Sequence, residues 1–354
     1  MPGTPLIVNA LGGLENPNVS GEHTGGGLVH TAADLAIDAR ALADAKSSGL
    51  TAVNITLGYV MGDFEPYEHT LEEIRTWDGI VGAHPDHLLA VRSAADIRRA
   101  RDEDRVGVIY GFQNAVAVGD DLTRVATFAE LGVRVVQLTY NQANHIGDGA
   151  MAPENRGLTP FGRDLVYVLN EHRLMVDLSH SGEQTCLEAA ALSRQPVSVN
   201  HTGCRALCDL PRNKTDDELR LVADTGGFVG IYFMPFLTGS GHPRATDVVD
   251  HLVHAVDVCG EDHVGIGTDG PVTAIDDLDA YREELAGHTA ARAEAGVAAA
   301  GERADTMPFV VDLRGADQFR KLIRLLEERG WSDERIAKVM GGNFVAYAER
   351  VWGA

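Results

Sequence analysis

Short apolar runs rich in valine and isoleucine alternate with longer amphipathic stretches along most of the chain. Such runs are typical of strands buried on both faces, and the stretches between them have the spacing of helices that pack one face on a core. The predicted strands are Leu6–Val8, Ala52–Thr56, Val106–Tyr110, Val133–Leu138, Met175–Leu178, Val197–Val199, Phe228–Phe233 and Val264–Gly267. The predicted helices are Ala32–Ser48, Ala94–Arg101, Leu122–Leu131, Phe161–Asn170, Glu183–Leu192, Asp216–Asp224, Thr246–Val258 and, after the last strand, Gln318–Arg329.

This alternation over 354 residues predicts an α/β fold, a (β/α)8 TIM-like barrel, as a single domain spanning residues 1–354. An open doubly wound sheet is the alternative, but the glycine motifs of its nucleotide-binding versions do not occur. An insertion at about 270–316 has an Ala-, Glu- and Arg-rich centre, which predicts a helix ending in a mobile loop. The residues from about 317 to 354 predict C-terminal helices, two of them short and placed around Gly341-Gly342.

The charge balance limits the possible partners. Lys and Arg number 30 and Asp and Glu number 52, so the net charge is −22. Nucleic acid and anionic membranes select basic surfaces, and neither is expected as a main partner. No run reaches the roughly 18 apolar residues of a membrane span, and the first residues lack the features of a signal peptide. The four cysteines are too few for a disulfide scaffold, so a reduced cytoplasm is the expected location.

Polar residues follow several of the predicted strands. In a (β/α)8 barrel the active site lies at the carboxyl ends of the strands, so these side chains should converge at one mouth. They are Asn9, Gln113, Tyr140, Asn141, the run Asp177-Leu178-Ser179-His180, the pair Asn200-His201, and Thr268-Asp269. His180 and His201 end successive strands, and imidazole is a common zinc ligand. Together with Asp269, which can bind a metal or accept a proton from water, they favour a metal-hydrolase site over structural histidines.

Other histidines and one arginine are further candidates. His145, in the loop after the fourth predicted strand, can face the mouth, as can His23 and His30, which flank a glycine run after the first strand. Arg212 precedes the helix that follows the sixth strand. A surface arginine is the simpler interpretation, but a guanidinium beside the mouth would bind a carboxylate.

Several segments of the sequence resemble the membrane (renal) dipeptidases, a family of the amidohydrolase superfamily. They read LGVRVVQLTYNQAN, GLTPFGRDLVYVLNEHRLMVDLSHSG, PVSVNHTGCRALCDLPRNKTDDEL, GGFVGIYF, DHVGIGTD and the late GGNF. They run in the family's order from about Gly107 to Asp269 and resume near Gly341. The resemblance implies a (β/α)8 barrel of the amidohydrolase type, often dimeric, that hydrolyses dipeptides with a binuclear metal centre. It also implies a tendency to accept D-residues at the C-terminal side.

Matching positions carry the family's site residues over to this chain. By this resemblance, His180 and His201 are the two histidines of one metal. Asp269 is then a metal ligand and proton acceptor. Arg212 holds the carboxylate of the substrate.

Other positions depart from the family's pattern. Leu11 and Gly13 stand where the first strand of the family ends in an H-x-D pair that binds the second metal. Gln113 stands at the place of the bridging glutamate, and Tyr140 at that of a histidine that polarises the substrate. A neutral amide has no charge with which to hold two cations together. We therefore do not expect the standard binuclear site.

One zinc ion on His180 and His201, helped by Asp269 or Gln113, is the expected centre, since catalytic zinc works with three protein ligands and a water. Glu15, His23 or His145 could substitute for the missing ligands. The second metal position is expected to be empty or weakly held.

These residues predict a metal-dependent dipeptidase-like hydrolase that acts on a small amide or dipeptide with a free carboxylate. Asp269 moves the proton, Tyr140 donates to the developing oxyanion, and Arg212, Tyr140 and Asn144 bind the substrate. One alternative is an altered enzyme that acts on another small carboxylate. The other is a non-catalytic binding protein with a degenerate metal site. A homodimer is expected from the resemblance.

Overall fold

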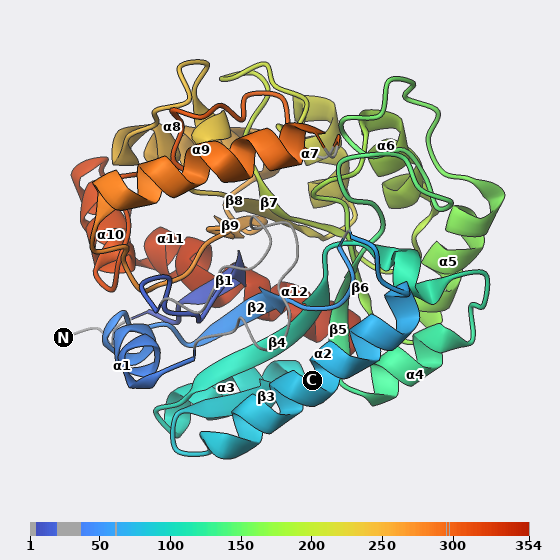
Figure 1. Cartoon of the computed structure of the whole chain (residues 1–354), viewed down its shortest axis with the longest axis horizontal. Coiled ribbons are helices and arrows are strands. Elements are labelled where there is room, and N and C mark those ends of the chain that lie inside the picture. The colour runs from blue at the N-terminus through green and yellow to red at the C-terminus, as the bar shows by residue number, and fades with distance from the viewer. Residues whose placement is uncertain (1–4, 20–36, 61, 295, 297, 354) are drawn as a thin grey trace.

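The computed structural model describes residues 5–19, 37–60, 62–294, 296 and 298–353, and within these ranges the strands form one parallel sheet (Figure 1). The strands are β1 Val8–Gly12, β2 Ala52–Thr56, β3 Leu88–Val91, β4 Val106–Phe112, β5 Val133–Gln137, β6 Met175–Asp177, β7 Ser198–Thr202, β8 Phe228–Ile231 and β9 Val264–Ile266. Since β1 pairs with both β2 and β9, and β2 also pairs with β4, the sheet closes on itself. The closed ring β1-β2-β4-β5-β6-β7-β8-β9 confirms the predicted (β/α)8 barrel.

One strand lies outside this ring. β3 pairs with the first half of β4: Leu88 lies opposite Val106, and Val91 lies opposite Ile109. β5 pairs with the second half of β4. The sequence pattern predicts neither β3 nor the long helix before it, α2 (Pro66–Ala83). The strand was missed because it contributes only a short apolar run, LLAV, which has no strong strand signal of its own.

The first strand begins and ends later than predicted, at Val8 and Gly12 in place of Leu6 and Val8. Asn9, expected as the end of the strand, lies inside it because its amide pairs with Thr268. Asn9 Nδ2 donates to Thr268 Oγ1 at 2.8 Å, and Asn9 Oδ1 accepts from Thr268 N at 2.8 Å. A polar pair therefore joins β1 to the residues after β9.

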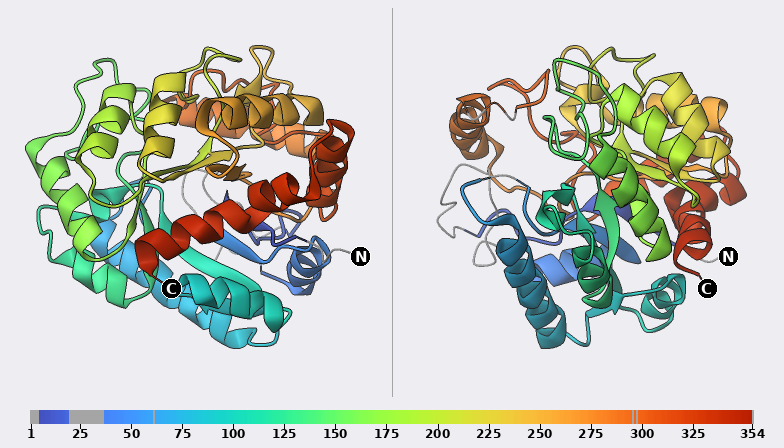
Figure 2. Two further views of the ribbon diagram at one scale, coloured as in Figure 1. Left: turned by 180° about the vertical axis from the view of Figure 1, so that it is seen from behind. Right: turned by 90° about the vertical axis from the view of Figure 1, so that its right-hand side faces the viewer.

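Helices cover the outside of the barrel (Figures 1 and 2). Their bounds are α1 Ala39–Ser47, α2 Pro66–Ala83, α3 Ala94–Asp102, α4 Arg124–Glu130, α5 Pro160–Glu171, α6 Glu183–Leu192, α7 Asp216–Asp224, α8 Ala245–Cys259, α9 Leu278–Glu294, α10 Gln318–Glu328, α11 Asp333–Ala337 and α12 Asn343–Trp352. A π-helical segment, Lys338–Gly342, joins α11 to α12, so the two short helices expected around Gly341-Gly342 are present. The insertion between β9 and α10 contains α9, the helix expected there.

The last helix closes one end of the barrel. α12, red in the left view of Figure 2, contacts β1, β6, β8 and β9. Its buried apolar residues, among them Phe344 and Val351, cluster with Val8, Met175 and Phe228, which stand at the beginnings of their strands. Since α12 fills the amino end, the carboxyl ends of the strands form the open mouth.

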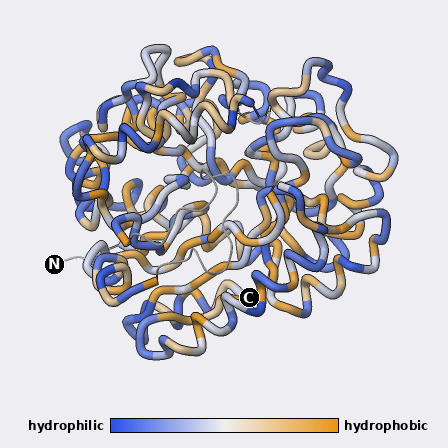
Figure 3. The backbone as a smooth tube through the Cα atoms, in the orientation of Figure 1, coloured by the Kyte–Doolittle hydropathy of each residue, from blue (hydrophilic) through white to orange (hydrophobic). Residues whose placement is uncertain are grey.

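Apolar colour follows the barrel strands and the helix faces turned toward them, while the outer turns are mostly hydrophilic (Figure 3). All four cysteines are buried free thiols. Among the helices in the described ranges, none combines the length and apolar character that a membrane crossing requires.

Buried Glu73, on α2, is expected to make stability depend on pH. Its side chain, 9% exposed, accepts a hydrogen bond from Gly58 N. Burial raises the pKa of this carboxyl from an ordinary 4.5 to about 7, so the native state binds the proton more tightly than the unfolded chain. The stabilisation from the protonated form is thus complete below pH 4.5 and lost as pH rises through 7.

A Glu73→Gln variant tests this expectation. Glutamine keeps an oxygen that accepts from Gly58 but does not titrate. Relative to wild type, the variant should gain roughly 2–3 kcal/mol of unfolding free energy between pH 5 and pH 8. Urea denaturation of both proteins at the two pH values measures this gain, and an equal difference at both would contradict it.

Candidate active site

His180 and His201 meet at the carboxyl end of the barrel. His201 lies in β7, and His180 is in the loop directly after β6. Both side chains are buried, and their Nε2 atoms are 2.9 Å apart. The structure therefore brings together the two imidazoles that the sequence places at successive strand ends.

The neighbours of His180 determine which of its ring nitrogens carries the proton. Its Nδ1 lies 2.6 Å from the amide oxygen of Asn141, which accepts but cannot donate. Nδ1 therefore carries the proton, and the lone pair of Nε2 points toward His201 Nε2. Such a second hydrogen bond to an oxygen is the usual way in which a metal-binding histidine is oriented. The Nδ1 atom of His201 has no partner within the described residues.

Both imidazoles are held in the neutral form. Burial lowers the pKa of His180 and of His201 well below the usual value, and the nearby charge of Arg212 lowers both further. Lys214 acts in the same direction on both rings. A neutral imidazole is the form that binds a metal ion, because the proton and the metal compete for one lone pair.

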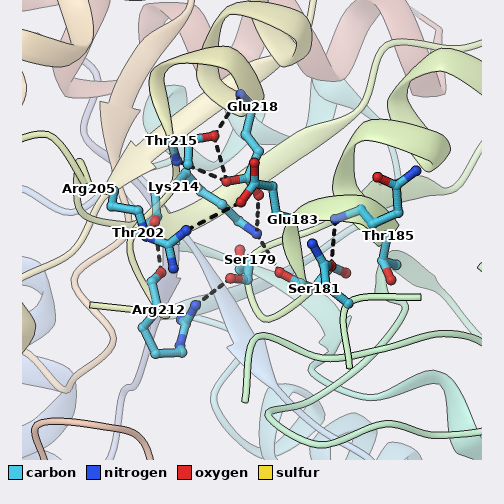
Figure 4. A network of polar contacts seen from close by, with 12 residues as sticks. Ser179, Ser181, Glu183, Thr185, Thr202, Arg205, Arg212, Lys214, Thr215 and Glu218 are labelled. Carbon is cyan, nitrogen blue, oxygen red and sulfur yellow. Dashed lines mark hydrogen bonds and ion pairs between the residues drawn. The ribbon is translucent and has the colours of Figure 1, made fainter. Parts of the chain in front are cut away.

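Two buried cations hold the loop that carries His180 (Figure 4). Arg212 Nη1 donates to the carbonyl oxygen of Ser179, and Lys214 Nζ donates to that of Ser181 at 2.6 Å. The carbonyls on either side of His180 are thus each bound by a cation from one segment, which leads into α7. This clamp fixes the backbone from which His180 projects.

The same segment begins α7 with a reciprocal cap. Thr215 Oγ1 accepts from Glu218 N, and the Glu218 carboxylate accepts from Thr215 N at 2.9 Å. The other Glu218 oxygen forms an ion pair with Lys214 Nζ at 3.0 Å, with both side chains only 2% exposed. The charge of Lys214, which binds the carbonyl oxygen of Ser181, is therefore neutralised inside the protein by Glu218, the residue that caps α7.

Arg212 is not the surface arginine of the simpler interpretation. It is 2% exposed, and its guanidinium carbon lies 5.9 Å from the ring centroid of Tyr232. The buried guanidinium donates to the carbonyl oxygen of Ser179 beside His180, so we expect removal of Arg212 to affect folding as well as the site. Its charge still acts on the histidine pair, so it stays a candidate for binding a carboxylate.

Asp269 follows β9 in an uncommon backbone conformation. Its φ is 60°, in the left-handed region that aspartate tolerates better than most residues, and its N–H donates to Leu11 O at 2.9 Å. Burial raises the pKa of its carboxyl to about 6, although Arg212, Arg292 and a hydrogen bond with Gln113 act in the opposite direction. A carboxyl with its pKa near neutrality is suited to accept and return a proton.

Tyr140 lies against the histidine pair and receives a contact from the insertion. Its ring stacks on that of His180 with centroids 4.3 Å apart, and Arg292 of α9 donates a hydrogen bond to its hydroxyl. Arg292 also binds Glu302 through Nε at 2.8 Å and Nη2 at 2.9 Å. Sequence reasoning missed this arginine and glutamate, because an alanine-rich segment gives no signal that it folds back over the mouth.

The remaining candidates lie in different surroundings. Asn144 uses both amide atoms within the barrel loops, donating to Asn114 Oδ1 and accepting from Ile146 N. His145 is exposed, with Nε2 3.1 Å from Gly119 O. His23 and His30 lie outside the described residues.

A cavity of about 420 Å³ opens beside these groups. Asp269 and Tyr140 line one part of it, and Arg292, Glu302 and other residues of the insertion line another. Pockets for small ligands typically enclose 300–1,000 Å³. The insertion therefore forms a wall of the cavity at the mouth of the barrel.

Comparison with known proteins identifies the family. The model for "Membrane dipeptidase (Peptidase family M19)" matches residues 31–285, more than two thirds of the chain. The chain belongs to this family. Dipeptidase tcpJ of Claviceps purpurea is 28% identical over 287 residues, which cover 80% of this chain and 60% of that protein. An uncharacterized dipeptidase of Schizosaccharomyces pombe is 30% identical over 223 residues, 60% of this chain and 54% of that protein.

This M19 family member thus spans little more than half the length of these two relatives. Among solved structures, an amidohydrolase from Pseudomonas aeruginosa is 30% identical, with a TM-score of 0.81 over 99% of this chain and 97% of that one. A metallo peptidase from Rhodobacter sphaeroides, solved with a phosphinate mimic of L-Ala-D-Ala, is 22% identical and shares the fold, with a TM-score of 0.75 over 99% of this chain and all of that one.

The M19 family is metal-dependent, and the histidine pair of this member fits the nitrogen ligands of one ion. Two nitrogens bound to one tetrahedral zinc at ~2.0–2.1 Å lie about 3.4 Å apart, so small movements would open the 2.9 Å gap enough to admit it. Within the described residues, however, no three His, Cys, Asp or Glu side chains gather closely enough to hold a metal. Neither Leu11 nor Gly13 has a side chain that can bind one.

Proposed function

We propose that this M19 family member is a metal-dependent dipeptidase-like hydrolase acting on a small amide or dipeptide with a free carboxylate. The observation that carries the proposal is the pair of neutral imidazoles whose Nε2 atoms face each other at 2.9 Å. We further propose that one zinc ion is held there. The homodimer and the cytoplasmic location stay predictions from the sequence.

Each residue near the pair has a distinct role in this proposal. The metal, when bound, supplies a Lewis acid that lowers the pKa of a water molecule. Asp269 accepts the proton of the attacking water and returns it to the leaving amine. Tyr140 donates a hydrogen bond to the oxygen that becomes negative, and Arg212 attracts the substrate carboxylate.

Hydrolysis assays with an Asp269→Asn variant test the function. Purified wild type loaded with zinc should hydrolyse members of a dipeptide panel that varies the stereochemistry of the C-terminal residue. Asparagine keeps the size of Asp269 but cannot take up a proton, so kcat at full metal occupancy should fall about a hundredfold or more. A fully metallated wild type that cleaves no dipeptide or other small amide would overturn the proposal.

The neutral Gln113 and the absent first-strand ligands favour one alternative, an altered enzyme for another small carboxylate. The same panel extended with lactams and N-acyl amino acids separates the two. Turnover confined to these added compounds identifies the altered enzyme.

A further inference from the structure

One face of α9 forms part of the wall of the cavity at the mouth. The residues of this face that line the cavity are Tyr281, Leu285, Thr289 and Arg292. They follow one another at intervals of four, four and three residues, the spacing of side chains on one side of a helix. At about 1.5 Å per residue, Tyr281 and Arg292 lie about 16 Å apart along the helix axis. The order of these residues along α9 therefore gives the order of surroundings along this wall.

The Arg292 end of the wall is polar and lies next to the histidine pair. Arg292 contacts Tyr140, whose ring stacks on that of His180. Glu302 binds the guanidinium of Arg292 from the segment that follows the helix. In the proposed function, the amide that reacts binds at this end.

The Tyr281 end of the wall is apolar. The ring of Tyr281 lies against that of Phe309, with centroids 5.9 Å apart, and Leu285 lies one turn further along α9. Both rings line the cavity and are half-buried, so part of their apolar surface is open to it. Burial raises the pKa of the Tyr281 hydroxyl to about 12, so this side chain is uncharged at neutral pH. Glu284, the acid beside it on α9, is exposed to solvent.

A cation holds the aromatic pair in place. The guanidinium carbon of Arg314 lies 5.8 Å from the ring centroid of Phe309. Its Nη1 donates to the carbonyl oxygen of Ile275 at 2.8 Å, which ties the end of the insertion to its beginning. The apolar end is thus built from both ends of the insertion and is fixed by a cation–π contact.

The two ends of the wall are further apart than a dipeptide is long. A fully extended dipeptide backbone spans about 7 Å, less than half of the separation between Arg292 and Tyr281. A dipeptide of small residues bound at the histidine pair therefore leaves the rings of Tyr281 and Phe309 without contact. Apolar surface of this kind gains stability when a ligand covers it.

We propose that the Tyr281 end is a binding subsite for a bulky aliphatic or aromatic group of the substrate, so that this family member prefers small amides that carry such a group. The group is the apolar side chain of a dipeptide or the acyl chain of an N-acyl amino acid, which bury the same kind of surface. The inference rests on the proposed function for the position of the amide, and it adds the chemistry of the other end of the substrate.

Turnover of two substrate series by the zinc-loaded wild type tests this inference. In one series, each residue of a dipeptide in turn is alanine, valine, leucine or phenylalanine. In the other, N-acyl-alanines carry acyl chains from acetyl to octanoyl. We expect kcat/KM to rise about fourfold for each added methylene until the apolar end is filled. The series with the steeper rise identifies the source of the apolar group.

Variants of the aromatic pair locate the effect. Phe309→Ala and Tyr281→Ala should each lower the ratio of kcat/KM between the largest and the smallest substrate about tenfold. Tyr281→Phe keeps the ring and should keep the ratio. Tyr167→Ala is the matched control, because Tyr167 lies on α5 outside the cavity, half-buried and with the guanidinium carbon of Arg194 5.1 Å from its ring centroid. Melting temperatures establish that each variant is folded.

A wild type whose kcat/KM does not depend on apolar size would keep the hydrolase and overturn this inference. Wild-type ratios in folded Phe309→Ala or Tyr281→Ala would also overturn it. If the wild type cleaves neither series, calorimetric titration with the same compounds replaces turnover. Affinity that rises with apolar size and falls in Phe309→Ala would then support the subsite while the hydrolase is rejected, and affinity without this dependence would reject both.

Discussion

His201→Ala should remove the bound metal and reduce kcat/KM about a thousandfold, because metal polarisation of water and substrate is worth several kcal/mol. His201 is fully buried in β7, and the lone pair of His180 Nε2 faces it at 2.9 Å. A single remaining imidazole cannot hold zinc at the affinity of two. Elemental analysis and turnover of the purified variant measure both effects.

A second histidine variant provides the control for this loss. His254 lies on α8, where its Nε2 contacts Asp216 Oδ1 at 2.8 Å, outside the histidine pair. His254→Ala removes the same side chain and should retain wild-type metal content and turnover. Full metal occupancy in His201→Ala would show that the ion binds elsewhere and would reject the histidine pair as its site.

Lys214→Met should destabilise the protein by about 3–5 kcal/mol, the usual cost of leaving one member of a buried ion pair without its partner. Its Nζ lies 3.0 Å from Glu218, and both side chains are almost inaccessible to water. Burial alone would raise the pKa of Glu218, but the charge of Lys214 and hydrogen bonds from Thr215 lower it overall. Without the lysine, a largely buried carboxyl must either stay charged or take up a proton.

Adding Glu218→Gln to Lys214→Met should recover most of this loss, since glutamine is neutral and keeps the oxygen that accepts from Thr215. An exposed pair gives the comparison. Lys321 contacts Asp317 at 3.1 Å with side chains 39% and 45% exposed, so Lys321→Met should cost less than about 1 kcal/mol. Urea denaturation of the variants measures these differences. Lys214→Met within 1 kcal/mol of wild type would contradict the role given to the buried pair.

The barrel could be predicted because most of its strands contain a buried apolar run, and such runs differ from helices in length and in their content of branched residues. The pattern failed where that signal is weak or mixed. β3 is four residues of leucine, alanine and valine, and β1 contains Asn9 and ends in a glycine. The polar amide of Asn9 predicts a loop unless its hydrogen-bond partner, Thr268, is known, and that partner is remote in sequence.

Only some residues of the candidate site could be predicted from the sequence, for similar reasons. His180, His201 and Asp269 could be found because their residue types are informative at strand ends. The burial of Arg212 and the contact between Arg292 and Tyr140 could not, because each depends on how a loop folds back. Glu15 could be named as a possible substitute ligand from its residue type, but its place in the wall of the cavity depends on how the segment after β1 folds.

The pairing of Asn9 with Thr268 has a consequence for the order in which the molecule can assemble. The two residues are 259 positions apart. One edge of β1 therefore stays unpaired until β9 and the residues after it have been synthesised. Asp269 follows Thr268 directly and binds Leu11 through its backbone. Its carboxyl therefore reaches the mouth only when the ring closes, and a nascent or partly unfolded chain lacks the proposed proton acceptor. Completed folding and a competent site are in this sense one event.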